Sequence, residues 1–294
     1  MARVAFVGLG TMGLPMARRL VGAGHEVVAC DADRERAWAL GGPTAETPAE
    51  AVRGADVAVT SLPSPEAVQV VLLGPTGLGA GARPGTLAID MSTGPPALAR
   101  RLAAKLPAFD VLDAPVSGGP RGAEEATLTI MVGGEERAFE RARPFFETLG
   151  RHVVHVGGHG AGQAAKLCNN LVAGATMAAL AESCAIAERE GLDASTFYAL
   201  LTASTGDSRV LRNRFPLAGV DAAHPASNAF APLFALDLIA KDLALALELA
   251  EGHGVDAAVA AAALAAYREA QREGLGGLDY SAVALRFRRP GGEE

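Results

Sequence analysis

The chain has 294 residues, of which 50% are hydrophobic and 20% charged, a composition typical of a globular protein that excludes a disordered one. This length allows one large domain or two ordinary ones. A formal net charge of −7 gives no electrostatic support to a nucleic-acid partner, so we expect none.

The cysteines and the first residues indicate the compartment. Cys30, Cys168 and Cys184 lie too far apart for a disulfide framework or a metal-ligand spacing, which suits a reducing cytoplasm. Arg3 is followed at once by a predicted strand and a glycine-rich turn, not by the apolar run of a signal peptide. We therefore expect a cytoplasmic protein.

Short apolar runs alternate with helical stretches through the first half of the chain. The predicted strands are Val4–Val7, Glu26–Ala29, Val57–Leu62, Leu87–Asp90, Phe109–Asp113, Thr127–Val132 and His152–Val156. The predicted helices are Thr11–Ala23, Asp33–Leu40, Glu66–Leu73 and Ala97–Leu106. This alternation is typical of an α/β domain with a doubly wound, mostly parallel sheet, in which ligands bind at the carboxyl ends of the strands. We expect this domain to occupy residues 1–160.

The second half changes character after Gly157-Gly158-His159-Gly160. From about Gly162 it is rich in Ala and Leu at helical spacing and contains no convincing strand. Its predicted breaks lie near residues 191, 204–207, 216–232 and 252–254. We predict an all-helical domain over residues 161–287 and a disordered tail over residues 288–294, which contain Pro290-Gly291-Gly292.

The longest apolar stretch, Leu171–Ala187, could be taken for a membrane span. Because it is rich in Ala and interrupted by Glu182, we predict a buried helix and no membrane partner. Its residues are small and apolar on all sides, which is more than a one-sided surface helix needs. The stretch therefore forms the centre of the helical domain or also serves a subunit interface.

Gly8, Gly10 and Gly13 form a G-x-G-x-x-G sequence between a predicted strand and a predicted helix, the context in which this motif binds a dinucleotide. The first glycine allows a tight turn, the second lets the pyrophosphate approach the backbone, and the third lets the helix pack on the strand. The loop Gly8-Leu9-Gly10-Thr11-Met12-Gly13 would hold the pyrophosphate at the helix N-terminus.

The acidic residue after the second strand bears on the choice of cofactor. Asp31 lies where a carboxylate accepts hydrogen bonds from the adenine ribose hydroxyls and repels a 2′-phosphate. It therefore favours NAD, while Arg34 and Arg36 are near enough in sequence to keep NADP possible.

Three further loops follow predicted strands. Ser117, Gly118 and Gly119 end Asp113-Ala-Pro-Val-Ser-Gly-Gly119, where successive backbone N–H groups and the Ser117 hydroxyl would form a cup for a carboxylate or phosphate; a plain strand-ending turn explains the segment equally well. Leu62-Pro63 and the loop that contains Thr93 would line the nicotinamide and its ribose.

Only three of the 26 basic residues are lysines. A lysine in this background is more plausibly a residue with a role that arginine cannot fill, because arginine is not deprotonated in proteins. Lys166 and Asn170 share one face of a predicted helix, flanked by Ala, Leu and Cys, and an apolar setting lowers the pKa of an ammonium toward useful acid–base chemistry. Lys241, next to Asp242, begins a second such face. Chance retention of Lys166 and a routine ion pair of Lys241 with Asp237 or Asp242 remain the alternatives.

Other catalytic patterns are missing from the sequence. The six histidines have no metal-ligand spacing with one another or with the cysteines, so we expect no metal. Neither a G-x-S-x-G elbow nor an H-E-x-x-H helix occurs, which argues against hydrolase and zinc chemistry.

Four segments together resemble the signatures of the β-hydroxyacid dehydrogenases, a family that includes 3-hydroxyisobutyrate dehydrogenase and tartronate semialdehyde reductase. They are Gly8-Leu-Gly-Thr-Met-Gly13, Asp113-Ala-Pro-Val-Ser-Gly-Gly119, Gly162-Gln-Ala-Ala-Lys166 with Asn169-Asn170, and Lys241-Asp242-Leu243. The resemblance runs in order from residue 4 to about residue 286. One departure is Ala126, where many members have Gly.

The resemblance implies a Rossmann domain followed by a helical domain, in a homodimer or homotetramer. It implies that Ser117, Gly118 and Gly119 hold the carboxylate of a small acid, that Lys166 is the catalytic acid/base, and that Asn170 orients the substrate. Lys241 would border the nicotinamide and the substrate.

The expected reaction is reversible hydride transfer between NAD(P) and C3 of a small 3-hydroxy acid of the 3-hydroxyisobutyrate or tartronate semialdehyde/glycerate type. A semialdehyde or imine reductase of the same architecture is one alternative, although Lys166 speaks against the imine version. The other is a non-catalytic dinucleotide-binding sensor, which would have no need of the Ser117–Gly119 cup or of Lys166.

Overall fold

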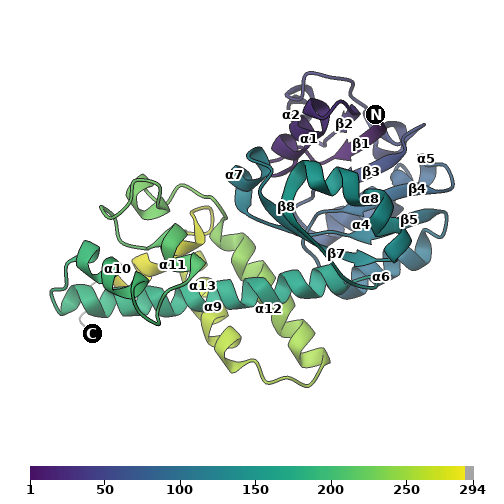
Figure 1. Cartoon of the computed structure of the whole chain (residues 1–294). Helices are drawn as coiled ribbons and strands as arrows, with labels where there is room; N and C mark the ends of the chain where they lie inside the picture. The colour runs from purple at the N-terminus through teal and green to yellow at the C-terminus, as the bar shows by residue number, and fades with distance from the viewer. Residues whose placement is uncertain (289–294) are drawn as a thin grey trace. The chain divides into compact units, whose positions relative to one another are not determined.

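The computed structural model describes residues 1–288 and divides into two compact units (Figure 1). Unit 1 is Met1–Lys166, and unit 2 begins at Leu167. The division therefore lies inside one long helix, α9 (Ala161–Arg189), whose start coincides with the predicted start of the helical domain. The first turns of α9 belong to unit 1 because they hydrogen-bond to its strand ends.

Unit 1 is built on one eight-stranded sheet of strand order β2-β1-β3-β4-β5-β7-β6, with β8 also paired to β7. The strands are β1 (Arg3–Val7), β2 (Glu26–Cys30), β3 (Val57–Thr60), β4 (Thr86–Asp90), β5 (Phe109–Asp113), β6 (Val116–Ser117), β7 (Leu128–Gly134) and β8 (Gly150–Gly157). Strands β1 to β5 are parallel, β7 is antiparallel to β5 and β6, and β8 is parallel to β7. The strand order reverses between β1 and β3, which is where doubly wound sheets bind their ligands.

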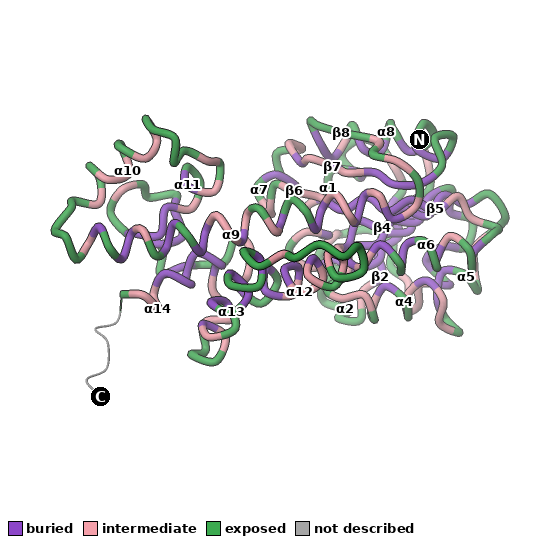
Figure 2. The backbone as a smooth tube through the Cα atoms, turned by 90° about the horizontal axis from the view of Figure 1, so that it is seen from below, coloured by how far each residue is buried: buried purple, intermediate pink, exposed green. Residues whose placement is uncertain are grey.

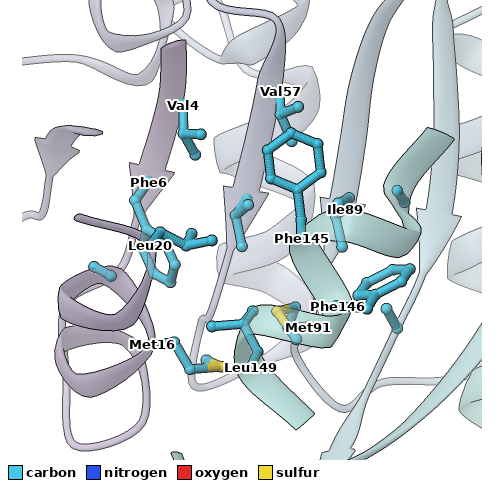
Figure 3. Close-up of a cluster of buried hydrophobic side chains, with 14 of the residues drawn as sticks. Val4, Phe6, Met16, Leu20, Val57, Ile89, Met91, Phe145, Phe146 and Leu149 are labelled. Carbon is cyan, nitrogen blue, oxygen red and sulfur yellow. The ribbon is translucent and has the colours of Figure 1, made fainter. Parts of the chain in front are cut away.

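Helices cover both faces of this sheet. They are α1 (Gly13–Gly22), α2 (Arg34–Trp38), α3 (Pro48–Ala51), α4 (Pro65–Leu73), α5 (Leu78–Gly81), α6 (Pro96–Lys105), α7 (Gly119–Glu124) and α8 (Glu136–Leu149). Alternate residues of one strand enter different cores: Val4 and Phe6 join one cluster (Figure 3), and Ala5 and Val7 join the other. Burial on both faces explains why the strands are continuous apolar runs; all of β4 is buried (Figure 2).

Every predicted strand and helix of the first half is present, with ends displaced by up to two residues. Helix α8 was missed, although Phe139, Ala142 and Phe146 lie at helical spacing and are buried. Pro144 inside the helix and the many charged residues obscured this pattern. The short α3, α5, α7 and β6 were missed as well, because elements of two to six residues carry little periodicity.

Unit 2 is helical, as the sequence predicts. Besides most of α9 it contains α10 (Ala194–Thr202), α11 (Arg209–Arg214), α12 (Leu236–Gly252), α13 (Ala258–Arg272), α14 (Ala284–Arg288) and the 3-10 turns η1 (Pro225–Asn228) and η2 (Tyr280–Val283). At Gly174 of α9 a Cβ atom would lie 3.0 Å from Leu243, so this glycine lets α12 approach closely. The Tyr267 hydroxyl donates a hydrogen bond to the Gly174 carbonyl and joins α13 to the same place.

The end of the chain and helix α9 differ in how they compare with the sequence predictions. The predicted tail starts one residue early, because Arg288 still belongs to α14 and pairs with Glu188; residues 289–294 lie outside the described residues. By length and composition, α9 is a helix that could cross a membrane, but half of its most apolar window is buried inside the protein, as in the core helix of a globular domain. That single candidate is weak evidence for a span.

Candidate active site

The glycine-rich loop after β1 is shaped by close backbone contacts. A Cβ atom at Gly8, whose φ is +93°, would collide with the Ser61 carbonyl, and one at Gly13 would collide with the Gly8 carbonyl. At Gly10, by contrast, the nearest atom to such a Cβ is Arg36 Nη1 at 3.7 Å. The protein's own packing therefore explains Gly8 and Gly13, while a ligand approaching the loop would explain Gly10.

The loop leads into the N-terminus of α1. Met12 caps this helix without a side-chain hydrogen bond, and of the first N–H groups that of Leu14 donates to the Gly10 carbonyl at 3.0 Å. Leu9 is buried and Thr11 is exposed. An N-terminus of this kind stabilises an anion by its partial positive charge, so the loop fits the pyrophosphate of a dinucleotide.

Asp31 closes on this loop from the end of β2. Its Oδ2 accepts a hydrogen bond from the Leu9 N–H at 2.6 Å, and its Oδ1 accepts one from the Asp33 N–H at 2.9 Å. A carboxylate has lone pairs left for ribose hydroxyls after two such bonds. The two nearby arginines are paired elsewhere, Arg34 with Glu46 at 2.8 Å and Arg36 with Asp33 at 3.2 Å.

The loops after β3 and β4 are joined by hydrogen bonds. The Leu62 N–H donates to Ser92 Oγ at 2.9 Å. The buried Asp90 carboxylate at the end of β4 accepts from Thr60 Oγ1 at 2.8 Å and from the Ser92 N–H at 3.1 Å. Burial raises the pKa of Asp90, and these hydrogen bonds lower it in part. Pro63 is exposed and Thr93 is half-buried in the same loops.

The predicted carboxylate cup follows β5. Ser117 ends β6, and Gly118 and Gly119 both have positive φ, +141° and +67°. A Cβ at Gly118 would lie 2.9 Å from Leu128 Cδ2, so both conformation and packing favour glycine there. Among residues 1–288 the Ser117 hydroxyl makes no hydrogen bond, which leaves it available to a ligand.

Lys166 is carried by the first turns of α9, which are fixed to the end of β5. The Asp113 carboxylate accepts hydrogen bonds from the Gly160 N–H at 2.7 Å and the Gln163 N–H at 2.9 Å. Lys166 lies one turn after Gln163 and is only 7% exposed. The loops after β1, β3, β4 and β5 all leave the same edge of a parallel sheet, and Asp113 attaches the helix of Lys166 to that edge.

Asn170 and Lys241 belong to unit 2, where the buried Asp242 holds both. Asn170 Nδ2 donates to Asp242 Oδ2 at 2.6 Å, and Lys241 Nζ lies 3.1 Å from Asp242 Oδ1. The amide of Asn170 is also bonded to Asn169 Nδ2 at 3.0 Å. The ion pair of Lys241 with Asp242 was one of the alternatives for this lysine, and it exists.

The structure thus brings the nucleotide loop, the loops at Leu62 and Thr93, the cup and Lys166 into unit 1, while Asn170 and Lys241 lie in unit 2. Three residues support the predicted site residues in a way that the sequence interpretation did not anticipate: Asp113, Gln163 and Asp242. All three are buried polar side chains, but each bonds to residues about 50 to 72 positions away, and no local pattern reveals such partners.

Several features lie outside this arrangement. An open pocket of about 550 Å³ between α12 and α13, lined by residues that include Glu248 and Arg268, contains none of the predicted site residues. Burial raises the pKa of the Cys30 thiol to about 11 and that of the Cys184 thiol to about 12, whereas Cys168 is exposed. Within residues 1–288 no group of three His, Cys, Asp or Glu side chains is arranged to hold a metal ion.

The chain is similar to known proteins over almost its whole length. Residues 3–157 match the NAD-binding domain of 6-phosphogluconate dehydrogenase, and residues 160–287 match the NAD-binding domain of NADP-dependent 3-hydroxyisobutyrate dehydrogenase. The chain is 39% identical to an NAD-dependent L-serine dehydrogenase of Pseudomonas aeruginosa over 98% of both chains. It is also 39% identical to a 3-hydroxyisobutyrate dehydrogenase of that organism over 98% of this chain and 99% of the relative.

A solved structure is similar throughout. It is a Mycobacterium tuberculosis 3-hydroxyisobutyrate dehydrogenase with L-serine, with a TM-score of 0.90 and 40% identity, covering 98% of this chain and 100% of that one. The match extends over the Rossmann domain and the helical domain alike, so the predicted fold class is confirmed.

Proposed function

Since the chain belongs to the β-hydroxyacid dehydrogenase family and is an NAD(P)-dependent hydroxyacid dehydrogenase, we propose that its substrate is a small 3-hydroxy acid that is oxidised at C3. 3-Hydroxyisobutyrate, L-serine and glycerate share this chemistry: a carboxylate, one carbon, and a carbinol. The observation that carries the proposal is the buried Lys166 on a helix fixed by Asp113 to the edge of the sheet that bears the nucleotide loop.

The cup at Ser117, Gly118 and Gly119 binds the substrate carboxylate in this proposal. The Ser117 hydroxyl and the N–H groups of the two glycines are donors, and charge-assisted hydrogen bonds to a carboxylate are the stronger kind. A substrate held by its carboxylate presents C3 at a fixed distance from the cup. Arg121 lies just beyond the cup but is already paired with Glu125, so it is not part of this proposal.

Lys166 is the proposed general acid/base. When bound, nicotinamide accepts or returns the hydride of C3. Lys166 Nζ, as a neutral amine, takes the proton of the C3 hydroxyl during oxidation; as an ammonium it returns that proton during reduction. A positioned acid/base of this kind accelerates a reaction by roughly 10²–10⁴-fold. Asn170, one turn further along α9, is proposed to orient the substrate, and Lys241 to border the nicotinamide and the substrate.

The test compares two variants of Lys166 with a control variant of another lysine. Lys166→Arg and Lys166→Met are expected to reduce turnover by about 10²-fold or more with a panel of 3-hydroxyisobutyrate, L-serine and glycerate, while NADH still binds. Lys105→Arg is the matched control, because Lys105 is exposed at the end of α6 and is expected to have no effect. Turnover of the Lys166→Arg variant at the wild-type rate would remove Lys166 from the mechanism. Reduction of an imine but of no semialdehyde would overturn the substrate class.

NAD is the proposed cofactor in preference to NADP. The Asp31 carboxylate beside Leu9 would repel a 2′-phosphate, and the ion pairs of Arg34 and Arg36 leave those guanidinium groups less available to one. NADH is therefore expected to bind more tightly than NADPH. Asp31→Ser is expected to reduce the difference between the affinities for the two cofactors. Equal affinities of the unmodified protein for the two cofactors would contradict the proposal.

A homodimer or homotetramer is proposed as the working state. Val172 and Ile186 of α9 are 63% and 61% exposed and lie four turns apart on one face, an arrangement that favours a subunit interface. Light scattering would show the assembly, and Val172→Glu with Ile186→Glu is expected to weaken it. Val70→Glu, at an equally exposed position of α4, is the control. A monomeric unmodified protein would refute the proposal.

A further inference from the structure

Gln163, in the first turn of α9, bonds to one neighbouring loop through both the oxygen and the nitrogen of its side-chain amide. Its Oε1 accepts a hydrogen bond from the Gly94 N–H at 2.9 Å, and its Nε2 donates one to the Ser92 carbonyl at 2.8 Å. The side chain is 2% exposed, so water cannot replace either partner. Both partners lie in the loop after β4, the loop that also contains Thr93.

The hydrogen bonds continue beyond that loop. Ser92 Oγ accepts from the Leu62 N–H, so the loop after β3 is attached to the loop after β4. The backbone N–H of Gln163 in turn donates to Asp113 at the end of β5. Gln163 is therefore the residue through which α9 and two strand-end loops are joined.

The start of α9 packs closely against the sheet. A Cβ at Gly162 would collide with the Met131 carbonyl, and one at Gly133 would lie 2.7 Å from both Asp113 Oδ1 and the Gly162 N–H nitrogen. The helix start is thus seated against β5 and β7 with no room for a side chain. Gln163 adds two hydrogen bonds that fix the position of the Ser92–Gly94 loop relative to the helix.

We propose that Gln163 is a positioning residue of the dehydrogenase, which fixes the Ser92–Gly94 loop relative to Lys166 one turn along α9. The inference rests on the proposed function, because it takes Lys166 as the acid/base and the loop as part of the nicotinamide site. An amide suits this role because it offers one acceptor and two donors in a plane. Misplacement of a reacting group by about 1 Å can reduce a rate by roughly 10²-fold, so a displaced loop would act on turnover.

The test compares two variants that each lose buried hydrogen bonding. Gln163→Met keeps the length of the side chain but cannot bond to Gly94 or Ser92. Thr86→Val is the matched control: the Thr86 hydroxyl is buried on β4 and donates to the Arg83 carbonyl at 2.8 Å, at the opposite end of the same strand. Both variants are expected to unfold at a lower temperature than the unmodified protein.

Kinetics separate positioning from stability. Gln163→Met is expected to lower kcat by about 10- to 100-fold with a change in NADH affinity below about threefold, whereas Thr86→Val keeps kcat. With NADH deuterated at the transferred position, the isotope effect on kcat is expected to rise only in Gln163→Met, because hydride transfer becomes slower. A fraction of unfolded enzyme cannot change an isotope effect. Wild-type kcat and isotope effect in Gln163→Met would overturn the role of Gln163 while leaving Lys166 untouched.

Hydrogen exchange tests the joint without any substrate. The Gly94 amide is expected to exchange slowly in the unmodified protein and in Thr86→Val, and at least about tenfold faster in Gln163→Met. Unchanged exchange at Gly94 in Gln163→Met would overturn the proposal that Gln163 fixes the Ser92–Gly94 loop, whatever the activity of the variant. Absence of turnover by the unmodified enzyme would instead overturn the proposed function, and the catalytic part of this inference with it.

Discussion

Asp90 and Asp113 are neighbouring buried carboxylates, paired in register across β4 and β5, and the same substitution should affect them differently. In Asp90 one oxygen, Oδ1, accepts both hydrogen bonds, so an asparagine can accept them with its single carbonyl oxygen. In Asp113 each oxygen accepts from a different backbone N–H. Asparagine would place its NH₂ group against one of those N–H groups, so that N–H would lose its acceptor and the new NH₂ group would be a second buried donor without one.

The magnitudes follow from these contacts. A buried donor without an acceptor costs about 1–3 kcal/mol, so two of them cost about 2–6 kcal/mol. Removing the buried Asp113 charge offsets part of this loss, so Asp113→Asn is expected to destabilise unit 1 by about 2 kcal/mol. In a domain of this size about 1 kcal/mol corresponds to roughly 2–4 °C, which gives a loss in Tm of about 4–8 °C. Asp90→Asn should change Tm at neutral pH by less than about 2 °C or raise it, because it also removes a buried charge near Asp113.

The pH dependence of stability is a second test of the burial of Asp90. Burial raises the pKa of Asp90 above its ordinary 3.8, so the folded state holds this proton more tightly than the unfolded state does. The unmodified protein therefore loses stability relative to Asp90→Asn as the pH rises from 3.8 through the raised pKa, and the two agree best in acid.

Thermal unfolding of the three proteins between pH 4 and pH 7.5, followed by circular dichroism, provides the measurement. NADH binding by each variant shows that the nucleotide loop is still formed. If Asp113→Asn were as stable as Asp90→Asn at every pH, the anchoring of α9 by Asp113 would be wrong.

Three further predictions concern other parts of the chain. Asp242→Leu, which removes the acceptor of Asn170 at similar volume, should lower kcat about tenfold and leave NADH affinity near the wild-type value in steady-state and binding assays. Ala126 has a φ of +54°, which disfavours a side chain, so Ala126→Gly should raise the free energy of unfolding by about 1 kcal/mol in urea titrations. Cys168 alone should react quickly with a thiol reagent in the native protein, because burial holds the other two thiols protonated; all three should react in denaturant.

The sequence predicts the architecture of unit 1 well because burial of the sheet on both faces requires strands that are apolar throughout, and such strands are recognisable in the sequence. Strands such as β3 and β4 are short apolar runs that end in polar or proline-containing loops, and these runs alternate with helical periodicity. The sequence pattern is weaker where a helix contains many charged residues and a proline, as in α8, or where an element has only a few residues, as in β6.

The departure at Ala126 illustrates what a resemblance alone leaves out. The resemblance implies glycine at this position, and the structure gives a physical reason: the backbone there has a positive φ, which glycine adopts without strain. This chain keeps the turn with an alanine, so the turn is set by its surroundings and not by the residue.

Residues that contact a ligand and residues that hold them in place differ in how far sequence can reveal them. Pyrophosphate requires glycine, a carboxylate requires donors, and proton transfer requires a titratable amine, so Gly8–Gly13, Ser117–Gly119 and Lys166 each carry a recognisable chemistry. A supporting residue needs only some acceptor or donor in the right place. Asp242 shows the consequence: beside Lys241 it is an ordinary ion pair in the sequence, and only the approach of α9 to α12 makes it the acceptor that holds Asn170. An ion pair of Lys241 and a functional role of its site do not exclude each other, because one carboxylate has two oxygens and can serve both.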